Sequence, residues 1–279
     1  MKLFIVNPIA GSFSKKILIS ILERSGHKVV CTSYPGEAEI LARETEADTV
    51  IAVGGDGTVN EVARGLMGTG KTLGIIPCGS GDGLALHLGL SHRLYRTLRI
   101  IKRGKTKPLD AASINGRLFF SVCGVGFDAK VSEKYAKSGK RGLASYLEQA
   151  FIIWKDYEPE RYTLEIDGRT WSKEAVLITI GNSDQWGNGA KVTPLADSSD
   201  GELDITIVDR FNSIEIPKLA FRLMTGTIDS DYRVHCYRGK QITISRKSEG
   251  PAHVDGEWFN TGRVIDIKVI PHALNVIIP

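Results

Sequence analysis

The sequence predicts two domains of different class: an α/β domain built on a parallel sheet, followed by a mainly-β domain of antiparallel strands. Over the first hundred residues, short apolar runs alternate with segments of helical periodicity, which is the βαβ pattern of a parallel sheet covered by helices. After Asp110, short runs are separated by turns such as IDGR and SSDGE, which favours antiparallel sheets. A chain of 279 residues with 42% hydrophobic composition can form two cores. We place the domains at 1–110 and 111–279, with the C-terminal segment free to return to the first domain.

The first domain is predicted element by element from this alternation. We expect a strand at 2–6, a helix at 13–25 ended by Gly26, a strand at 28–32, a helix near 37–46, a strand at 50–53, a helix from Thr58 onward and a strand at 73–76. Thr58 and Glu61 fit a capping box, which would fix where the third helix begins. From 93 to 107, basic residues surround an apolar stripe of Leu94, Leu98 and Ile101, which predicts an amphipathic helix.

The second domain shows shorter apolar runs. We expect strands at 117–122, 162–166, 175–180, 203–208 and 241–245, interrupted by one helical segment at about 129–155. Neither an internal repeat nor a low-complexity linker divides the chain.

Composition excludes several classes of protein. No apolar stretch approaches the roughly 20 residues of a membrane span, and the first apolar run reaches Asn7 and Pro8 too soon for a signal peptide. The four cysteines are widely separated and lack C-x-x-C spacing, so we expect neither disulfides nor a zinc site. These observations favour a cytoplasmic protein.

The formal charge of +4 is unevenly distributed, with basic residues gathered at 93–107 and again at Lys134, Lys137, Lys140 and Arg141. No aromatic residues are interleaved in the way that would favour nucleic acid binding. The first basic run fits either a solvated helix face or attraction to an anionic membrane surface.

A glycine-rich turn lies within VIAVGGDGTVNEV, residues 50–62, between a buried strand and a helix. Such a turn suits phosphate, because residues without side chains let backbone N–H groups approach closely and the helix N-terminus adds positive potential. Asp56 within it needs a partner, since a carboxylate facing phosphate costs energy unless it binds a cation or takes a proton from a reacting hydroxyl. A structural role as a turn aspartate is the alternative.

Two further segments follow strands in the same way. PCGSGDGLA, 77–85, comes after the strand LGII, and NPIAG, 7–11, comes after the first strand. In a parallel sheet these turns gather at the carboxyl ends of the strands, where ligands bind. Together they make a cradle for a triphosphate plausible.

Two other motifs match known fingerprints in the wrong context. GLMGTGKT, 65–72, satisfies the P-loop spacing, but a helix precedes it and a strand follows, which is the reverse of a P-loop. GVGFDA, 124–129, matches a dinucleotide fingerprint, yet no second strand with a ribose-binding acid follows at about 20 residues. We expect neither to bind a nucleotide in those modes.

Six segments in order resemble one family. NPIAG, GGDGTVNEV, PCGSGDGLA, GVGFDA, VTPLADSSDGELD and HVDGEW resemble the diacylglycerol kinase catalytic-domain superfamily, which includes bacterial soluble lipid kinases, sphingosine kinases and ceramide kinases. The resemblance spans nearly the whole chain. It implies an N-terminal Rossmann-like nucleotide-binding domain and a C-terminal β-sandwich-like lipid-substrate domain, with the active-site cleft between them.

The resemblance also implies residue roles and cofactors, namely ATP and Mg2+. Around the nucleotide it places Asn7, Pro8, Gly11, Thr32, Gly54, Gly55, Asp56, Gly57, Thr58, Asn60, Glu61, Gly79, Ser80 and Gly81. Asp56 would act in catalysis, directly or through magnesium, Glu257 would be the general base, and Asp128 would lie near the lipid head group. Metal-binding positions are Asp197, Asp200 and Glu202, with Asp110 and Asp204 linked to the cleft. For each of these acids, an ordinary turn or strand-edge carboxylate is the alternative.

The sequence departs from the family at one turn. Many members have Asn at the position of Asp82, followed by Asp or Ala where this chain has Gly83. An acid there adds negative charge beside the expected phosphates, so it would bind metal or lower the affinity for nucleotide.

We therefore expect a lipid kinase that transfers the γ-phosphate of ATP to a hydroxyl of diacylglycerol or a sphingoid-type lipid, in phospholipid biosynthesis or related lipid metabolism. Its partner would be a membrane surface, contacted peripherally on the inner face, without nucleic acid and without a transmembrane segment. A homodimer is one assembly that the sequence leaves open. NAD kinase shares the opening turn but places an Asn-Glu pair much farther downstream than Asn60 and Glu61. A lipid- or nucleotide-binding protein without turnover is the other alternative.

Overall fold

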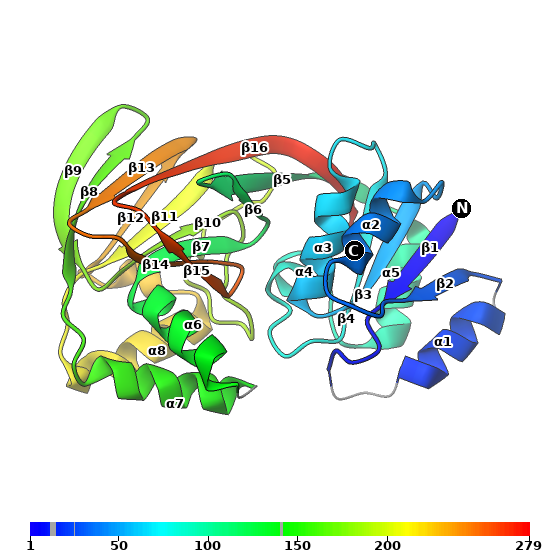
Figure 1. Cartoon of the computed structure of the whole chain (residues 1–279), viewed down its shortest axis with the longest axis horizontal. Helices are drawn as coiled ribbons and strands as arrows, with labels where there is room; N and C mark the ends of the chain where they lie inside the picture. Colours follow the sequence, from blue (N-terminus) through cyan, green and yellow to red (C-terminus); the bar gives the residue numbers. More distant parts are fainter. Residues whose placement is uncertain (12–14, 25, 140–141) are drawn as a thin grey trace. The chain divides into compact units, whose positions relative to one another are not determined.

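The computed structural model describes residues 1–11, 15–24, 26–139 and 142–279 (Figure 1). The chain divides into two compact units. Unit 1 comprises Met1–Asp110 and His272–Pro279, and unit 2 comprises Ala111–Pro271. The chain enters unit 2 within strand β5 (Thr106–Ile114) and returns to unit 1 within strand β16 (Val264–Ile277).

Unit 1 is an α/β unit, as the sequence predicts. Its elements are β1 (Lys2–Val6), α1 (Lys15–Arg24), β2 (Lys28–Cys31), α2 (Glu37–Glu44), β3 (Thr49–Gly54), α3 (Asp56–Leu66), β4 (Thr72–Pro77), α4 (Gly83–His87) and α5 (Leu94–Arg103). The strands form a parallel sheet in the order β2-β1-β3-β4, and the C-terminal end of β16 pairs with β4. Strands β3 and β4 are buried almost throughout, because helices cover both faces of the sheet.

One expectation for unit 1 is wrong and another falls partly outside the described residues. The capping box is wrong: α3 begins at Asp56 with Gly55 as its N-cap, so Thr58 lies inside the helix and is buried. The glycine turn itself ends the strand and starts the helix, so no side-chain cap is required. Of the helix predicted at 13–25, residues 13, 14 and 25 lie outside the described residues.

Unit 2 is mainly β and antiparallel. Beyond β5, its strands are β6 (Arg117–Phe119), β7 (Val122–Gly126), β8 (Glu160–Ile166), β9 (Arg169–Ala175), β10 (Leu177–Gly181), β11 (Leu203–Val208), β12 (Val234–Gly239), β13 (Gln241–Arg246), β14 (Gly250–Val254) and β15 (Glu257–Thr261). Its helices are α6 (Phe127–Ser138), α7 (Leu143–Trp154) and α8 (Ile216–Thr225), with short 3-10 turns at Ser213–Glu215 and Ile228–Ser230.

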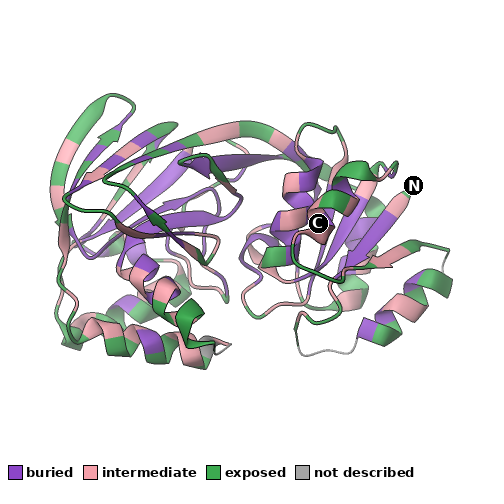
Figure 2. Cartoon of the chain, viewed as in Figure 1, coloured by how far each residue is buried: buried purple, intermediate pink, exposed green. Residues whose placement is uncertain are grey.

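The core of unit 2 lies between two sheets. One has the order β12-β11-β10-β7-β14-β15, and the other combines β9, β8, β13 and the N-terminal part of β16 with β5 and β6. Residues from both sheets form one buried cluster that includes Val125, Leu164, Ile180 and Ile244. Figure 2 shows buried residues concentrated on the strands of each unit. Alternating burial along β8 is typical of a sheet with one face on a core.

The boundaries of unit 2 differ from the predicted ones in three places. The helical segment expected at 129–155 is two helices, because Gly139 adopts a positive φ of 66° that ends α6. The run at 117–122 is divided between β6 and β7 by a bend. The run at 175–180 contains the end of β9 and most of β10.

Candidate active site

Three turns lie side by side at the carboxyl edge of the unit 1 sheet. Strand β3 pairs with β1 on one side and with β4 on the other, so the turns after these strands are neighbours. Two backbone hydrogen bonds extend the pairing into the turns: Asn7 N–H donates to Val53 O (3.0 Å) and Cys78 N–H to Gly54 O (2.8 Å). This is the edge at which parallel α/β sheets bind ligands.

The carboxylate of Asp56 joins the second turn to the third. Its Oδ2 accepts the backbone N–H of Asp82 and its Oδ1 accepts that of Gly83, both at 2.8 Å. Hydrogen bonds from backbone N–H groups to an ionised carboxylate are among the stronger ones in proteins. An acid in this glycine turn therefore has a structural task, in addition to any chemical one: it fixes how the two turns meet.

The first turn is held against the third by close backbone approach. Gly11 has a φ of +71°, and a Cβ atom there would lie 1.7 Å from the carbonyl oxygen of Cys78. Only glycine fits this position. By contrast, a Cβ at Gly57 in the second turn would meet nothing within 4 Å, so the backbone there is open to a ligand. The N-terminus of α3 adds positive potential at the same place.

The residues predicted to surround the nucleotide differ in accessibility. Pro8, Gly11, Gly57 and Ser80 are exposed, Asn7, Thr32, Gly55, Asp56, Glu61, Gly79 and Gly81 are half-buried, and Gly54, Thr58 and Asn60 are buried. Two of them support the turns: Thr58 Oγ1 accepts a hydrogen bond from Asn7 Nδ2 (3.2 Å), and Glu61 Oε2 accepts the Ala38 N–H (3.3 Å) at the start of α2. Their roles toward a nucleotide stay predictions.

The P-loop alternative is excluded by the position of Lys71. This lysine precedes β4, so it lies at the amino edge of the sheet, opposite the glycine turns. Its Nζ donates to the carbonyl oxygens of Arg43 (2.9 Å) and Ala42 (3.5 Å) at the end of α2. The dinucleotide-type motif, GVGFDA, spans β7 and the start of α6, but both neighbours of β7 are antiparallel, so it is not part of a βαβ unit.

In unit 2, a tight hairpin presents Glu257. Strands β14 and β15 are joined by Asp255 and Gly256, whose φ values of 48° and 84° are those of a type I′ turn. The Asp255 carboxylate accepts the backbone N–H groups of Phe120, Ser121 and Val122 at 2.9–3.0 Å. Burial raises the pKa of Asp255, and these three hydrogen bonds oppose that change. Asp255 thus anchors the turn, while Glu257 is exposed.

Asp128 lies buried in the first turn of α6. Its Oδ2 accepts a hydrogen bond from Thr179 Oγ1 (2.9 Å) and lies 3.0 Å from His253 Nε2. A Cβ on Gly124 would lie 2.5 Å from Asp128 Oδ2, so the glycine of GVGFDA leaves room for this cluster. The sequence pattern did not predict Thr179 or His253 as members of the site. His253 stands within HVDGEW, and that motif was the only signal that could have pointed to it.

The acidic segment before β11 contacts an arginine. The Arg238 guanidinium contacts Asp200 and lies 3.3 Å from a carboxylate oxygen of Glu202 and 3.6 Å from one of Asp204. Burial raises the pKa of Asp204 to about 6, Asp200 and Glu202 add to this change, and Arg238 opposes it. The Oδ2 atom of Asp204 accepts no hydrogen bond from the described residues. Asp197 Oδ1 accepts the Ser199 N–H (3.1 Å) and hydroxyl (2.7 Å).

This segment fits magnesium only in part. Its oxygen atoms are the ligands that the ion prefers, but Asp204 Oδ2 is buried and lies 3.6 Å from Arg238 Nε. However, no group of three or more His, Cys, Asp or Glu side chains within the described ranges could hold a metal ion. Asp110 is in unit 1, where its Oδ1 accepts the His272 N–H. A metal at these residues would need backbone oxygens as well, and the site stays a prediction.

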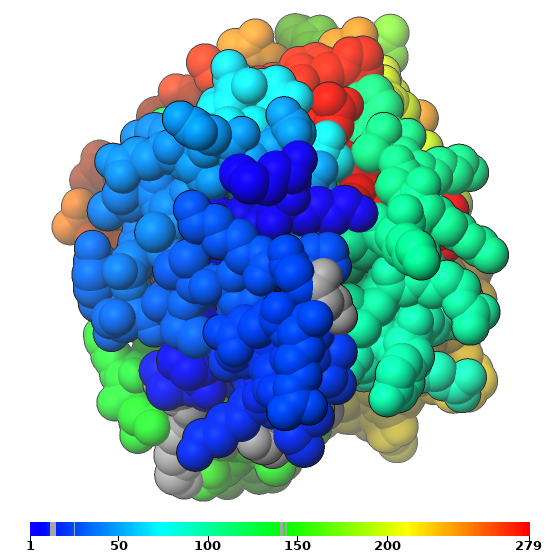
Figure 3. Space-filling view, turned by 90° about the vertical axis from the view of Figure 1, so that its right-hand side faces the viewer, coloured from blue at the N-terminus to red at the C-terminus, as the bar shows by residue number. Residues whose placement is uncertain are grey.

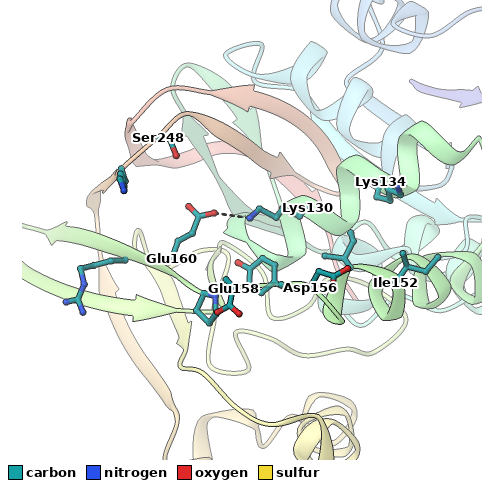
Figure 4. Close-up of a pocket in the computed structure, with 12 residues that line it drawn as sticks. Lys130, Lys134, Ile152, Asp156, Glu158, Glu160 and Ser248 are labelled. Carbon is teal, nitrogen blue, oxygen red and sulfur yellow. Dashed lines mark hydrogen bonds and ion pairs between the residues drawn. The ribbon is translucent and has the colours of Figure 1, made fainter.

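A pocket of about 770 Å³ opens elsewhere in unit 2, between the middle of α6, the end of α7 and the start of β8 (Figure 4). Lys130 extends into it, with its Nζ 3.0 Å from Glu160 Oε1 and 4.8 Å from the centre of the Tyr157 ring. None of the predicted site residues lines this pocket.

Comparisons with known proteins agree with this architecture. The diacylglycerol kinase catalytic domain matches residues 2–114, and the YegS C-terminal NAD kinase beta sandwich-like domain matches residues 121–278. An uncharacterized Synechocystis protein is 32% identical over 82% of this chain, which spans only 54% of that protein's length. The diacylglycerol kinase of Bacillus subtilis is 26% identical over 91% of this chain and 88% of its own.

A solved structure is similar over the whole chain. A presumed diacylglycerol kinase from Bacillus anthracis str. Sterne superposes with a TM-score of 0.81 at 27% identity, covering 100% of this chain and 97% of its own. Fold and turns therefore define a two-domain protein of the lipid kinase class. The chain belongs to the diacylglycerol kinase family, with a diacylglycerol kinase catalytic domain followed by a YegS-type C-terminal domain. The resemblance found in the six sequence motifs is confirmed.

The Asp255 anchor predicts a loss of stability. Asp255→Ala leaves three N–H groups without their acceptor, so the free energy of unfolding should fall by about 2–4 kcal/mol. Asp167→Ala is the matched control, because Asp167 occupies the same kind of turn and accepts two N–H groups but is exposed. It should cost about 1 kcal/mol or less. Urea unfolding followed by circular dichroism measures both, and equal losses would contradict this role.

The position of Lys71 predicts that it has no part in nucleotide binding. Lys71→Ala removes only contacts with the end of α2, so its KM for ATP should stay within about twofold of the wild-type value. Steady-state kinetics with varied ATP measure this value. A large increase in KM for Lys71→Ala would revive the P-loop alternative.

Proposed function

We propose that this protein is an ATP-dependent lipid kinase that transfers the γ-phosphate to a hydroxyl of diacylglycerol or of a sphingoid-type lipid. The observation that carries the proposal is the set of three glycine turns joined at one sheet edge, with the backbone of Gly57 open to a ligand. Membership of the diacylglycerol kinase family supports the choice of a lipid as acceptor.

In this proposal, unit 1 binds the phosphates of ATP. Backbone N–H groups of the turns and the N-terminus of α3 offset the phosphate charge without reorganising during the reaction. Ser80, exposed in the third turn, offers a hydroxyl to the same groups. Magnesium bound together with ATP would supply further charge neutralisation on the transferring phosphoryl group.

The acceptor hydroxyl would be activated by unit 2. Its oxygen attacks the γ-phosphorus, the bond from that phosphorus to the β–γ bridging oxygen breaks, and ADP leaves. Glu257, exposed beside a rigid turn, takes the hydroxyl proton as general base. Asp128 orients the polar head group of the lipid, with its own position fixed by Thr179 and His253.

Contact with a membrane is also part of the proposal. No helix in the described part of the chain is long and apolar enough to cross a bilayer. Helix α5 carries Arg96, Arg99, Lys102 and Arg103, none of which forms an ion pair with another described residue, and Tyr95 is 80% exposed. Residues of this helix are exposed, in blue-green, on the face shown in Figure 3. We propose that α5 contacts the anionic inner surface of the membrane peripherally.

Two other functions are tested by the same experiments. The C-terminal domain is described as NAD kinase beta sandwich-like, so NAD is an alternative acceptor. A protein that binds lipid or nucleotide without turnover is the other alternative.

The kinase proposal predicts a labelled lipid. Protein, magnesium and ATP labelled at the γ-phosphate are incubated with dispersed diacylglycerol, a sphingoid base, ceramide, monoacylglycerol or NAD, and the products are separated. One lipid should be labelled, and Glu257→Gln should reduce its kcat by about 100-fold or more, because general-base catalysis is worth that much. Because Glu257 is exposed, its replacement by Gln should not unfold the protein, so misfolding would not explain such a loss.

The control for this variant is Glu174→Gln, which changes an exposed glutamate on β9 of the same unit. It should leave kcat unchanged. Label in NAD would move the assignment to an NAD kinase, and measurable ATP binding without any labelled product would favour a binding protein.

The membrane proposal predicts a loss that depends on the form of the substrate. Reversing Arg96, Arg99 and Lys102 to Glu should lower activity on anionic vesicles at least tenfold, since each basic residue near such a surface contributes about 1 kcal/mol. Activity on detergent-dispersed lipid should be retained. Reversal of Lys16, Arg24 and Lys28 alters the charge equally and should have a smaller effect. Equal losses in both formats would contradict membrane contact by α5.

A further inference from the structure

The third glycine turn contains a buried acid whose position is unusual for a phosphate site. Asp82 is only 2% exposed and has a φ of +48°, a region that residues other than glycine seldom occupy. A buried carboxylate beside phosphate groups is unfavourable unless its own charge is compensated. The contacts of Asp82 show how this chain compensates it.

Both carboxylate oxygens of Asp82 have a donor. Oδ1 accepts the backbone N–H of Gly79 (3.1 Å), which closes the turn on itself. Oδ2 lies 2.7 Å from Nε2 of His92, which donates because an ionised carboxylate can only accept. The backbone N–H of Asp82 in turn donates to Asp56. The imidazole is therefore the outer end of a chain of contacts that runs through the third turn to the second.

His92 is held in place from the other side. Its side chain is 55% exposed and stands just before α5. The hydroxyl of the buried Thr97 in the first turns of α5 donates to the carbonyl oxygen of Ser91 (2.8 Å), which fixes the backbone beside His92. The helix that we assign to membrane contact thus also positions the imidazole.

Other ionisable groups near the Asp82 carboxylate have partners or environments of their own. Burial raises the pKa of the Asp82 carboxyl, whereas the His92 and Gly79 hydrogen bonds and the Lys15 ammonium oppose that change. Lys15 also donates to the carbonyl oxygen of Ala10, and the Cys78 thiol near it has a pKa raised by burial to about 11. The His92 imidazole is the side chain in direct contact with the Asp82 carboxylate, at 2.7 Å.

We propose that His92 is a positioning residue for the nucleotide: by donating to Asp82 it offsets the charge of that carboxylate and holds the 77–83 turn in its phosphate-binding shape. This inference rests on the proposed binding of ATP by unit 1. Without His92, Asp82 retains the Gly79 N–H but presents an uncompensated charge beside the phosphates. ATP binding should weaken, while the transfer step and the binding of the lipid should not change.

The experiment compares His92→Ala with the double variant His92→Ala/Asp82→Asn. His92→Ala should raise the KM for ATP about tenfold, the loss expected for one hydrogen bond to a charged carboxylate, with kcat and the KM for lipid within about twofold. The double variant should recover most of the affinity, because a neutral Asn still accepts the Gly79 N–H and carries no charge that a second donor must offset. Rescue by a second substitution is not expected of a residue that merely supports folding.

A matched control exists in unit 2. His235 and Asp209 form a partly exposed His–Asp pair, with 2.9 Å between Nε2 and Oδ2, and Asp209 also lies 3.1 Å from the Lys173 ammonium. His235→Ala should leave the KM for ATP unchanged. An equal rise in KM for this control, a fall in kcat alone for His92→Ala, or a failure of Asp82→Asn to rescue would each overturn the inference.

Titration calorimetry with Mg-ATP separates this inference from the proposed function. If wild-type protein binds ATP but labels no acceptor, the kinase proposal fails, and the dissociation constants of the same variants still decide the role of His92: a tenfold weakening that is rescued supports it, and unchanged binding contradicts it. If wild-type protein does not bind ATP, both proposals are wrong.

Discussion

The bridge from the Asp56 carboxylate to the backbone of Asp82 and Gly83 is the contact on which the candidate site depends. Parallel pairing of β1, β3 and β4 brings three turns to one edge, but pairing alone does not fix the shape of loops beyond the last ladder hydrogen bond. The carboxylate fixes it, because two N–H groups from one turn must meet two oxygens from another. Cys78 N–H, bound to Gly54 O, completes the junction.

The same arrangement occurs in unit 2 with different residues. Asp255 uses its carboxylate to accept three backbone N–H groups, while Glu257, two positions later, stays exposed. In both motifs an aspartate fixes the backbone and a neighbouring position remains open: Gly57 after Asp56, and Glu257 after Asp255. Carboxylates withdrawn from water are costly unless each oxygen finds a donor, and these two half-buried aspartates find donors in backbone N–H groups. A rigid frame then surrounds the groups to which we assign chemistry.

The local pattern of apolar residues predicted the fold well, but it could not predict contacts between residues that are distant in the sequence. The alternation in unit 1 and the strand at Leu203–Val208 follow from periodicity alone. The segment at 129–155 is divided because one glycine adopts a positive φ. The strands β9 and β12 were not predicted, nor was α8, although Pro217 at its start and Gly226 at its end are local helix signals. His92, Arg238 and His253 were not foreseen, because each is defined by a partner distant in sequence or by tertiary packing. The unusual acid at Asp82 was visible in the sequence, but the donors that compensate its charge are visible only in the tertiary structure.

Hydrogen–deuterium exchange of the 77–85 segment, with and without Mg-ATP, is the direct test of whether Asp56 builds the phosphate site by joining the turns. ATP should slow exchange in both glycine turns of the wild-type protein. In Asp56→Asn, exchange in 77–85 should be faster without ATP, and the protection by ATP should be lost there, while β3 remains protected as in the wild type. If ATP protects the segment equally in the variant, Asp56 does not build the phosphate site by joining the turns.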